Sequence, residues 1–379
     1  MTIFDDITRG DADPPHQDET AFAYLNRSGR PEAARVRQLI NDWLTHYPAH
    51  DRDSLVTRLR SVIDDQHRSA FFELFIHELV ITRGHKVIAI EPKLVDKTKS
   101  PDFLVAAKEG HQLYLECVLA TGRSQQEVAA QARLNQALTV IDRTPSPVHF
   151  LDLSVHGVPT APISIKKMMR MLLTWIAKLP DDDTCMDAAP FDYEECGVSI
   201  SLRAFRRHNR DRAGRAIGAR FFPVRQVTDD GDVKSALEKK ASRYGTLDHP
   251  YVVAVNALGI WARESNAVDA LFGSPCIVVR HMEHGTITNE EGRNTDGVWW
   301  GPSGGRRKRL SAVLSTERID PWNFACRHGR LIRNPWATVP LPSFELGIDH
   351  YERQDGGYRI KDGRRMGELL GLPEGWPEV

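Results

Sequence analysis

FFELFIHELVITRGHKVIAIEPKLVDKTKSPDFLVAAKEGHQLYLECVLAT, residues 71–121, is the stretch that decides the fold of this chain. Its first part, 71–81, is a dense apolar run that is too long for a surface strand, so it predicts a helix that ends at Gly84. A short strand, KVIAIEP, and a polar loop follow. The β-forming residues 103–105 and 113–115 then flank a Lys-Glu-Gly turn, a pattern that predicts a β-hairpin.

The predicted hairpin brings two carboxylates together. Asp102 stands at the start of its first strand, and Glu116 lies well along the second strand. A rigid hairpin can hold two such side chains close to each other, and carboxylate oxygens are the ligands that a hard cation such as Mg²⁺ prefers. The sequence therefore predicts a site for a divalent cation at Asp102 and Glu116.

These residues resemble the motif of the PD-(D/E)XK nuclease superfamily. Pro101-Asp102 is followed fourteen positions later by Glu116, and a helix that contains Glu73 precedes both. The resemblance implies that Asp102 and Glu116 bind Mg²⁺ or Mn²⁺ and that Cys117 contributes its backbone carbonyl. It also implies a lysine two positions after the glutamate, to polarise the attacking water, but Val118 occupies that position.

Another polar side chain must therefore take the place of the motif lysine. Lys99 is the favoured candidate because it directly precedes Pro101-Asp102. Functional groups in this superfamily can move to neighbouring positions, which makes other residues near the hairpin candidates as well. These other candidates are Lys97, Lys108, Thr121, Gln125 and Gln126.

The carboxylate of the preceding helix has two candidates. The spacing to Gly84 in related nucleases favours Glu73, and a helical wheel places Glu73 with His77 on the polar side. Glu78 falls within the apolar stripe, where a buried carboxylate is costly unless it is paired or bound to a metal. Both residues therefore remain candidate ligands, with Glu73 preferred.

The elements that follow predict an α/β fold with a mixed central sheet flanked by helices. A helix at 124–143 and a strand at 148–155 would complete an α-β-β-β-α-β core, which is the restriction-endonuclease-like arrangement of the superfamily. The resemblance covers 66–156, about a quarter of the chain. The predicted parts are a flexible arm (1–30), a helical buttress (31–65), the nuclease-like core (66–180) and a basic α/β extension (181–379).

Two arginine-rich segments predict contact with phosphates. Arginine presents forked donors that match phosphate oxygens, and such contacts hold nucleic acid without reading its sequence. The alternative is that these residues are solubilising loops or internal partners of acidic side chains. The residues are Arg203, Arg206, Arg207, Arg210, Arg212 and Arg215, which follow a strand predicted at 198–202 and placed at one edge of the fold, and Arg306, Arg307, Lys308 and Arg309. Trp299 and Trp300 could stack on bases, although a place in the core is favoured.

The composition sets limits on the function. A net charge of −1 excludes a generic polyanion binder, so any nucleic-acid surface must be local. The chain lacks an apolar run long enough to span a membrane, and its N-terminus is polar and acidic, unlike a signal peptide. The five cysteines form no C-x-x-C pair, so neither a zinc site nor a disulfide framework is indicated. A cytoplasmic protein without a membrane partner is expected.

Three functions are compatible with these patterns. The first is a metal-dependent nuclease, with DNA as the favoured substrate. The second is a nuclease fold that binds nucleic acid without cutting it, in which Val118 marks lost activity. The third is a scaffold whose arginines meet acidic protein partners. An even cut of both strands of a duplex would need two sites, so a homodimer is an open alternative.

Overall fold

The chain divides into two compact units. The computed structural model describes residues 2–16, 18–94, 99–121, 125–208, 216–221, 229–259, 264–281, 287–354 and 357–378. Unit 1 comprises Met1–Asp13, Thr20–Gly122 and Val227–Val379, and unit 2 comprises Pro14–Glu19 and Arg123–Gln226. The segment 66–180, which the sequence predicts as one core, therefore contributes to both units.

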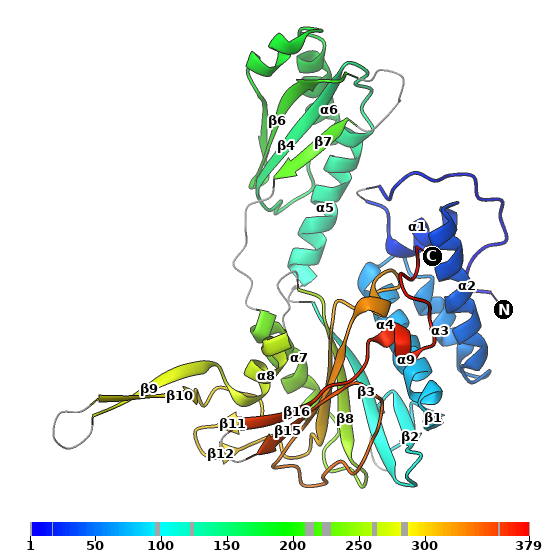
Figure 1. The fold of residues 1–379 in the computed structure, drawn as a ribbon. Helices are drawn as coiled ribbons and strands as arrows, with labels where there is room; N and C mark the ends of the chain where they lie inside the picture. The colour runs from blue at the N-terminus through cyan, green and yellow to red at the C-terminus, as the bar shows by residue number, and fades with distance from the viewer. Residues whose placement is uncertain are drawn as a thin grey trace. The chain divides into compact units, whose positions relative to one another are not determined.

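Unit 1 is built on a mixed sheet (Figure 1). In the described residues the strand order is β1-β2-β3-β8-β13-β14-β15-β16. The strands are β1 Lys86–Ile90, β2 Phe103–Ala106, β3 Gln112–Ala120, β8 Tyr251–Ala257, β13 Ala312–Glu317, β14 Gly329–Arg333, β15 Asp349–Gln354 and β16 Gly357–Lys361. β1, β2 and β3 are antiparallel neighbours, whereas β3 and β8 run parallel. The α/β class and the predicted hairpin are confirmed.

Four helices at the N-terminal end of unit 1 cover one face of this sheet. They are α1 Ala21–Arg27, α2 Pro31–His46, α3 Arg52–Leu59 and α4 Asp64–Thr82. α4 is buried along most of its length because it is apolar on nearly every side, as expected of a core helix. Trp43, Phe71, Phe75 and Phe324 form its aromatic contacts, with ring centroids 5.4–6.5 Å apart. Gly84, with φ +84°, follows the end of α4, as the sequence predicts.

The opposite face is covered by α7 Asp229–Ala241 and α8 Glu264–Phe272. α7 stands between β3 and β8 in the chain, so the order α4-β1-β2-β3-α7-β8 forms an α-β-β-β-α-β arrangement. The prediction that 124–143 and 148–155 complete this arrangement is wrong. Those segments fold as α5 Gln125–Asp142 and β4 His149–Gly157, which belong to unit 2 and to another sheet.

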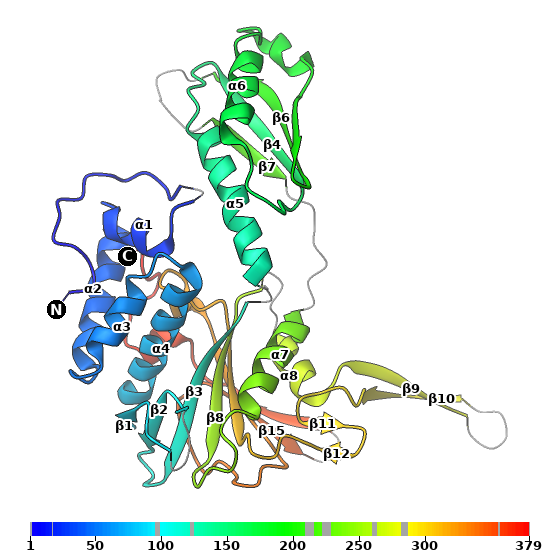
Figure 2. The same cartoon turned by 180° about the vertical axis from the view of Figure 1, so that it is seen from behind.

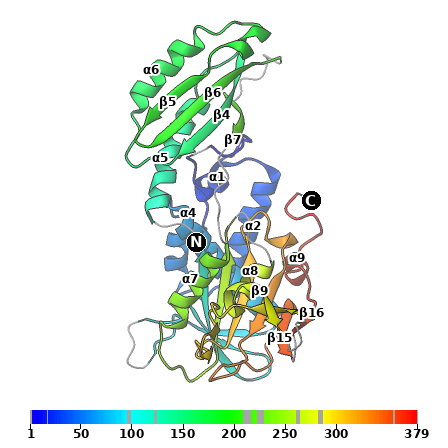
Figure 3. The same ribbon diagram turned by 90° about the vertical axis from the view of Figure 1, so that its left-hand side faces the viewer.

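Unit 2 is a four-stranded sheet with helices on one face (Figure 3). The strand order is β5-β6-β4-β7, with β5 Phe191–Glu195, β6 Val198–Arg206 and β7 Ile217–Phe221. Apolar side chains of α5 and of α6 Ile165–Ile176 pack against this sheet, and the short helix η1 Asp183–Asp187 lies beside β6. β6 extends beyond the strand predicted at 198–202, and it is an inner strand of its sheet.

The remaining elements belong to unit 1. β9 Pro275–His281 and β10 Ile287–Arg293 form a separate two-stranded ribbon, seen from behind in Figure 2. β11 Trp300–Gly301 and β12 Gly304–Gly305 form a small hairpin, and η2 Phe324–Cys326 packs on α9 Met366–Leu369. Trp299 is fully buried, which confirms its predicted place in the core. Trp300 is half-buried and stacks on Trp336 with the ring centroids 5.3 Å apart.

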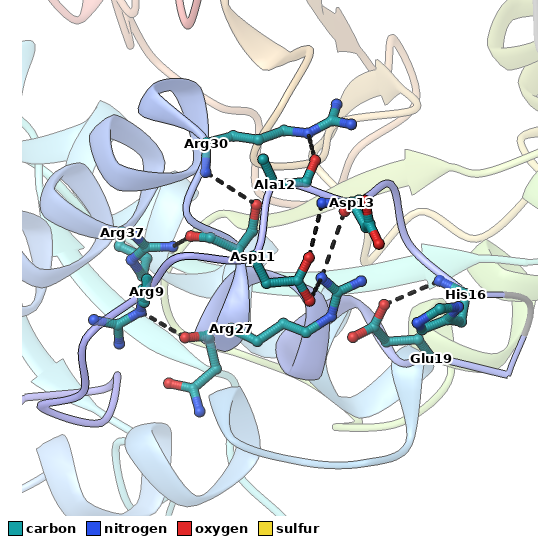
Figure 4. Close-up of polar contacts among 11 residues, drawn as sticks. Arg9, Asp11, Ala12, Asp13, His16, Glu19, Arg27, Arg30 and Arg37 are labelled. Carbon is teal, nitrogen blue, oxygen red and sulfur yellow. Dashed lines mark hydrogen bonds and ion pairs between the residues drawn. The ribbon is translucent and has the colours of Figure 1, made fainter. Parts of the chain in front are cut away.

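The first residues of the chain are packed rather than extended as an arm. Ile3 and Phe4 are buried against the N-terminal helices. Arg27 forms an ion pair with Asp11 at 2.6 Å, and Arg30 Nε donates to the backbone carbonyl of Ala12 at 2.7 Å (Figure 4). The flexible arm predicted for 1–30 is therefore wrong for the described residues of unit 1, because these contacts and α1 hold the segment to the fold.

Two features expected from the composition can be compared with the described chain. None of the helices that the structure describes is long and apolar enough to cross a membrane. All five cysteines are free thiols.

Candidate functional site

Asp102 and Cys117 meet where β2 separates from β3. The last paired residues of these strands are Phe103 and Leu115. Beyond this pair, the backbone N–H of Cys117 has no partner in β2, and it donates to Oδ2 of Asp102 at 2.6 Å. The hairpin register therefore places the Asp102 carboxylate directly beside the residue that follows Glu116.

Glu116 is a buried carboxylate surrounded by donors. Its side chain is 1% exposed. Lys240 of α7 donates to Oε1, and Arg243 Nη1 lies 3.1 Å from the same atom. The Tyr244 hydroxyl lies 2.6 Å from Oε2 and 2.7 Å from the carbonyl oxygen of Ser100. Two cations and a phenol thus compensate the burial of this charge, which would otherwise be costly.

The alternation of β3 explains why α7 supplies these donors. Tyr114, Glu116 and Val118 share one face of the strand, since side chains alternate along it. Apolar residues of this face pack with Leu237 and Ala241 of α7. Lys240 comes from that same helix, so it reaches Glu116 over the face on which the motif lysine would stand.

A second buried carboxylate comes from the other face of the sheet. Glu73 of α4 is paired with Arg58 of α3 through both oxygens, at 2.5 and 2.9 Å. The Tyr47 hydroxyl donates to Oε1 of Glu73 at 2.8 Å. Burial and the charge of Glu73 raise the pKa of the Tyr47 phenol, so it remains a proton donor.

Asp102 is influenced by the carboxylates on both faces. Burial raises the pKa of Asp102 to about 8, and the negative charges of Glu116 and then Glu73 add to this effect. The N–H of Cys117 and the charge of Lys240 act in the opposite direction. Asp102 is therefore largely protonated at neutral pH in the metal-free protein. Three acidic side chains share one electrostatic environment at this point.

In the part of the chain that the structure describes, Glu78 and Lys99 form no ion pair or hydrogen bond with Asp102 or Glu116. Glu78 is buried, but it pairs with Nδ1 of His46 at 2.9 Å. Lys99 is exposed, and no ion pair joins it to an acid among the residues that the structure describes. Among the described residues, the lysine that contacts Glu116 is Lys240.

Lys240, Arg243 and Tyr244 were missed because the partner helix of β3 lies far along the chain. The apolar residues Val233, Leu237 and Ala241 recur at helical spacing, and Lys240 follows Leu237 by three positions. A helical wheel therefore places Lys240 beside the buried stripe. This lysine at the margin of an apolar helix face was the sequence pattern that could have indicated a contact between Lys240 and a buried acid.

The predicted basic residues fall into several groups. Arg306 is held by Glu238 of α7 at 2.8 Å, whereas Arg307, Lys308 and Arg309 are exposed beside it. In unit 2, Arg203 is exposed and Arg206 lies 3.6 Å from Asp183. Arg207 is buried. Arg210, Arg212 and Arg215 lie outside the described residues.

The donor types at the cluster suit a hard divalent cation. Asp102 and Glu116 offer carboxylate oxygens and Cys117 offers a carbonyl, which are ligand types that Mg²⁺ accepts. Within the described ranges, however, no three His, Cys, Asp or Glu side chains are grouped closely enough to hold a metal ion. Lys240 and Arg243 now neutralise the negative charge of Glu116. A cation bound at this point would neutralise that charge in their place.

No family model, curated protein or solved structure matches this chain.

Proposed function

We propose that the protein hydrolyses phosphodiester bonds of nucleic acid, with DNA as the favoured substrate, at a PD-(D/E)XK-like site. The observation that carries this proposal is the contact of Lys240 with the buried carboxylate of Glu116, beside Asp102. β3 has Val118 in place of the motif lysine, and the ammonium group of Lys240 contacts the Glu116 carboxylate from α7. The order α4-β1-β2-β3-α7-β8 supports a restriction-endonuclease-like core.

Asp102, Glu116 and the carbonyl of Cys117 would hold Mg²⁺ or Mn²⁺. Such a cation lowers the pKa of a bound water and stabilises negative charge on the scissile phosphate. The raised pKa of Asp102 favours this role, because a cation can replace the proton that the carboxylate retains in its absence. Glu73 adds negative charge to the same point from α4, and Arg58 and Tyr47 hold its carboxylate in place.

Lys240 is the group that we assign to orienting the attacking water. Its side chain is 19% exposed, and Glu116 holds its ammonium group in position. Arg243 adds a second positive charge at the same carboxylate, where it can stabilise a phosphate oxygen.

A basic surface close to α7 would bind the nucleic-acid backbone. Arg306 is anchored to Glu238, two residues before Lys240 on the same helix. Arg307, Lys308 and Arg309 follow it and are exposed. These side chains are available to contact phosphates next to the proposed site.

The test is cleavage of linear duplex, supercoiled plasmid, single-stranded DNA and RNA with Mg²⁺, Mn²⁺ or EDTA. The variants are Asp102→Asn and Glu116→Gln, with Asp53→Asn as the control because Asp53 is an exposed acid on α3. We expect metal-dependent cleavage by the wild type and the control, and loss of cleavage in both site variants. Cleavage that persists in both site variants would exclude this site.

One observation favours a second candidate, a nuclease fold that binds nucleic acid without cutting it. Glu116 is already neutralised by Lys240 and Arg243. The same assay separates the two functions. Absence of cleavage by the wild type under every condition, with salt-dependent binding of nucleic acid retained, would support the binding function.

A further inference from the structure

Among the residues that the structure describes, helices cover one face of the unit 2 sheet, and the other face, called the open face here, carries none. In β4, Leu151, Leu153 and Val155 are buried in a core shared with α5 and α6. Alternation directs the intervening residues of β4 and β6 to the opposite face. The apolar core that the structure describes in unit 2 contains none of those intervening residues. The open face therefore needs its own explanation.

Two phenylalanines lie side by side on this open face. Phe150 of β4 is directly opposite Phe205 of β6, and each is 37% exposed. β4 and β6 are the two inner strands, so the pair lies within the sheet and not at its margin (Figure 3). Directly opposed residues of an antiparallel pair have their Cβ atoms about 5 Å apart. Two large aromatic side chains thus lie next to each other, and each is partly exposed.

A glycine on the neighbouring strand leaves space for one of these rings. A Cβ atom placed on Gly218 of β7 would lie 3.2 Å from Cβ of Phe150 and 3.4 Å from two atoms of its ring. That separation is tighter than most Cβ contacts, so a larger residue would press on Phe150. The absence of a side chain here keeps the ring uncrowded on the open face.

Positive charge accompanies the aromatic pair. Arg203 is exposed on the same face of β6, and the guanidinium carbon of Arg207 lies 3.9 Å from the centroid of the Phe150 ring. Arg206 belongs to the other face, where it lies near Asp183. The open face also carries acids, of which the nearest along the chain is two residues from Phe150. They are Asp152, opposite Arg203, and Asp192 and Glu194 on the edge strand β5.

We propose that this open face binds unpaired bases of single-stranded nucleic acid, which stack on Phe150 and Phe205 while Arg203 contacts an adjacent phosphate. Aromatic side chains on an open sheet bind bases of any sequence through their rings, and duplex bases are not available for such stacking. This inference rests on the proposed function only in taking nucleic acid as the ligand. It adds a binding surface in unit 2 that requires no cleavage.

The experiment measures the binding of the full-length protein to a labelled oligodeoxythymidine of about 16 nucleotides, near the upper limit of site sizes on such platforms. Fluorescence anisotropy in EDTA keeps cleavage out of the measurement. The test variant combines Phe150→Leu and Phe205→Leu, which keep apolar volume but remove the rings. The control is Leu173→Ala, because Leu173 is an exposed apolar residue on α6, at the covered side of the same sheet.

We expect the double Leu variant to bind about tenfold more weakly or worse, with the control unchanged, because each stacked base contributes strongly to affinity. An oligomer with the same phosphates but abasic sugars should bind weakly to the wild type and should not distinguish the variants. Replacement of both rings by Trp should preserve binding, which separates a stacking role from a general role in folding.

Three results would overturn the inference. They are equal affinity of the wild type and the double Leu variant, equal binding of the abasic oligomer, and a wild-type dimer in sedimentation that the double Leu variant abolishes. The last result would assign the face to a second copy of the chain. A protein that fails to cleave nucleic acid can still pass the stacking test, since binding is measured without metal. Failure of the stacking test, in turn, does not change the result of the cleavage assay with the Asp102 and Glu116 variants.

Discussion

A carboxylate removed from water must be paired with donors or retain its proton, and this protein uses both solutions within one site. Glu116 receives Lys240, Arg243 and Tyr244. Asp102 receives a single backbone N–H, and burial together with neighbouring negative charge raises its pKa to about 8. In the proposed function this difference serves two roles, because Glu116 would position a cationic side chain while Asp102 would exchange its proton for a metal ion.

Lys240 provides the sharpest test at the residue scale. Lys240→Met keeps an unbranched side chain, one atom shorter, and removes its charge from Glu116. If Lys240 orients the attacking water, cleavage should fall by about a hundredfold or more, as for loss of a positioned polar group. The measurement is the single-turnover cleavage rate at saturating protein, which excludes effects on binding.

The matched control for this prediction is Lys239→Met, since Lys239 is the preceding residue of α7 and is exposed. It should cleave at the wild-type rate. Thermal unfolding of both variants separates chemistry from folding, because Glu116 retains Arg243 and Tyr244 when Lys240 is replaced. A Lys240→Met protein that is folded and fully active would show that Lys240 has a structural role only.

At the scale of elements, α3 and α4 are joined by a buried histidine. Nδ1 of His67 in α4 lies 2.6 Å from the carbonyl oxygen of Leu59, the last residue of α3. Nε2 has no hydrogen-bond partner among the described residues. Burial lowers the pKa of His67 below its ordinary value of 6.5, and the carbonyl of Leu59 only partly opposes this effect. The folded protein therefore holds the imidazole neutral.

This histidine predicts loss of stability in mild acid. Below pH 6.5 the unfolded chain takes up a proton at His67 that the folded protein does not bind, so the free energy of unfolding falls as the pH decreases. The contribution is fully present above pH 6.5 and is lost as the pH falls towards the lower pKa of the folded state. His67→Gln keeps a donor for Leu59 and removes the proton uptake, so its stability should depend less on pH in this range.

Urea unfolding of both proteins between neutral and acidic pH measures this effect. The control is His156→Gln, which replaces an exposed imidazole of unit 2 and should reproduce the wild-type dependence. The same pH dependence in His67→Gln and the wild type would contradict the prediction and point to His77 and His85, whose pKa values burial also lowers.

Local patterns predicted some elements well and others incorrectly, for a physical reason. α4 and the hairpin of β2 and β3 were predicted because periodicity and turn residues act within a few positions. The hairpin also placed Asp102 next to the residue after Glu116. The origin of Lys240 depends on which helix covers β3, and that helix begins more than a hundred residues later. Periodicity carries no information about such a contact.

At the scale of the whole molecule, unit 2 is inserted between two neighbouring elements of unit 1. The chain leaves β3, forms unit 2, and returns to α7 and β8. β3 and β8 nevertheless pair in parallel from Tyr114 and Tyr251 onward. Because consecutive elements usually neighbour each other, the prediction assigned α5 and β4 to this sheet. Their sequence patterns are genuine for a helix and a strand, so only the sheet to which they belong was wrong.

The insertion predicts that unit 1 folds without unit 2. Parallel strands need a crossover of a dozen or more residues, usually with a helix, and α7 provides that crossover between β3 and β8. Replacement of 123–226 by glycine-serine linkers of several lengths should therefore preserve cooperative unfolding and the contact of Lys240 with Glu116.

The excised protein should retain a Mg²⁺-dependent rise in its melting temperature that Asp102→Asn removes, because a ligand that binds only the folded state stabilises it. It should also bind oligodeoxythymidine more weakly than the full-length protein, since Phe150 and Phe205 are removed with unit 2 while the basic residues beside α7 remain. Excised proteins that fail to unfold cooperatively at every linker length would show that unit 2 is part of the folding unit of the β3-α7-β8 crossover.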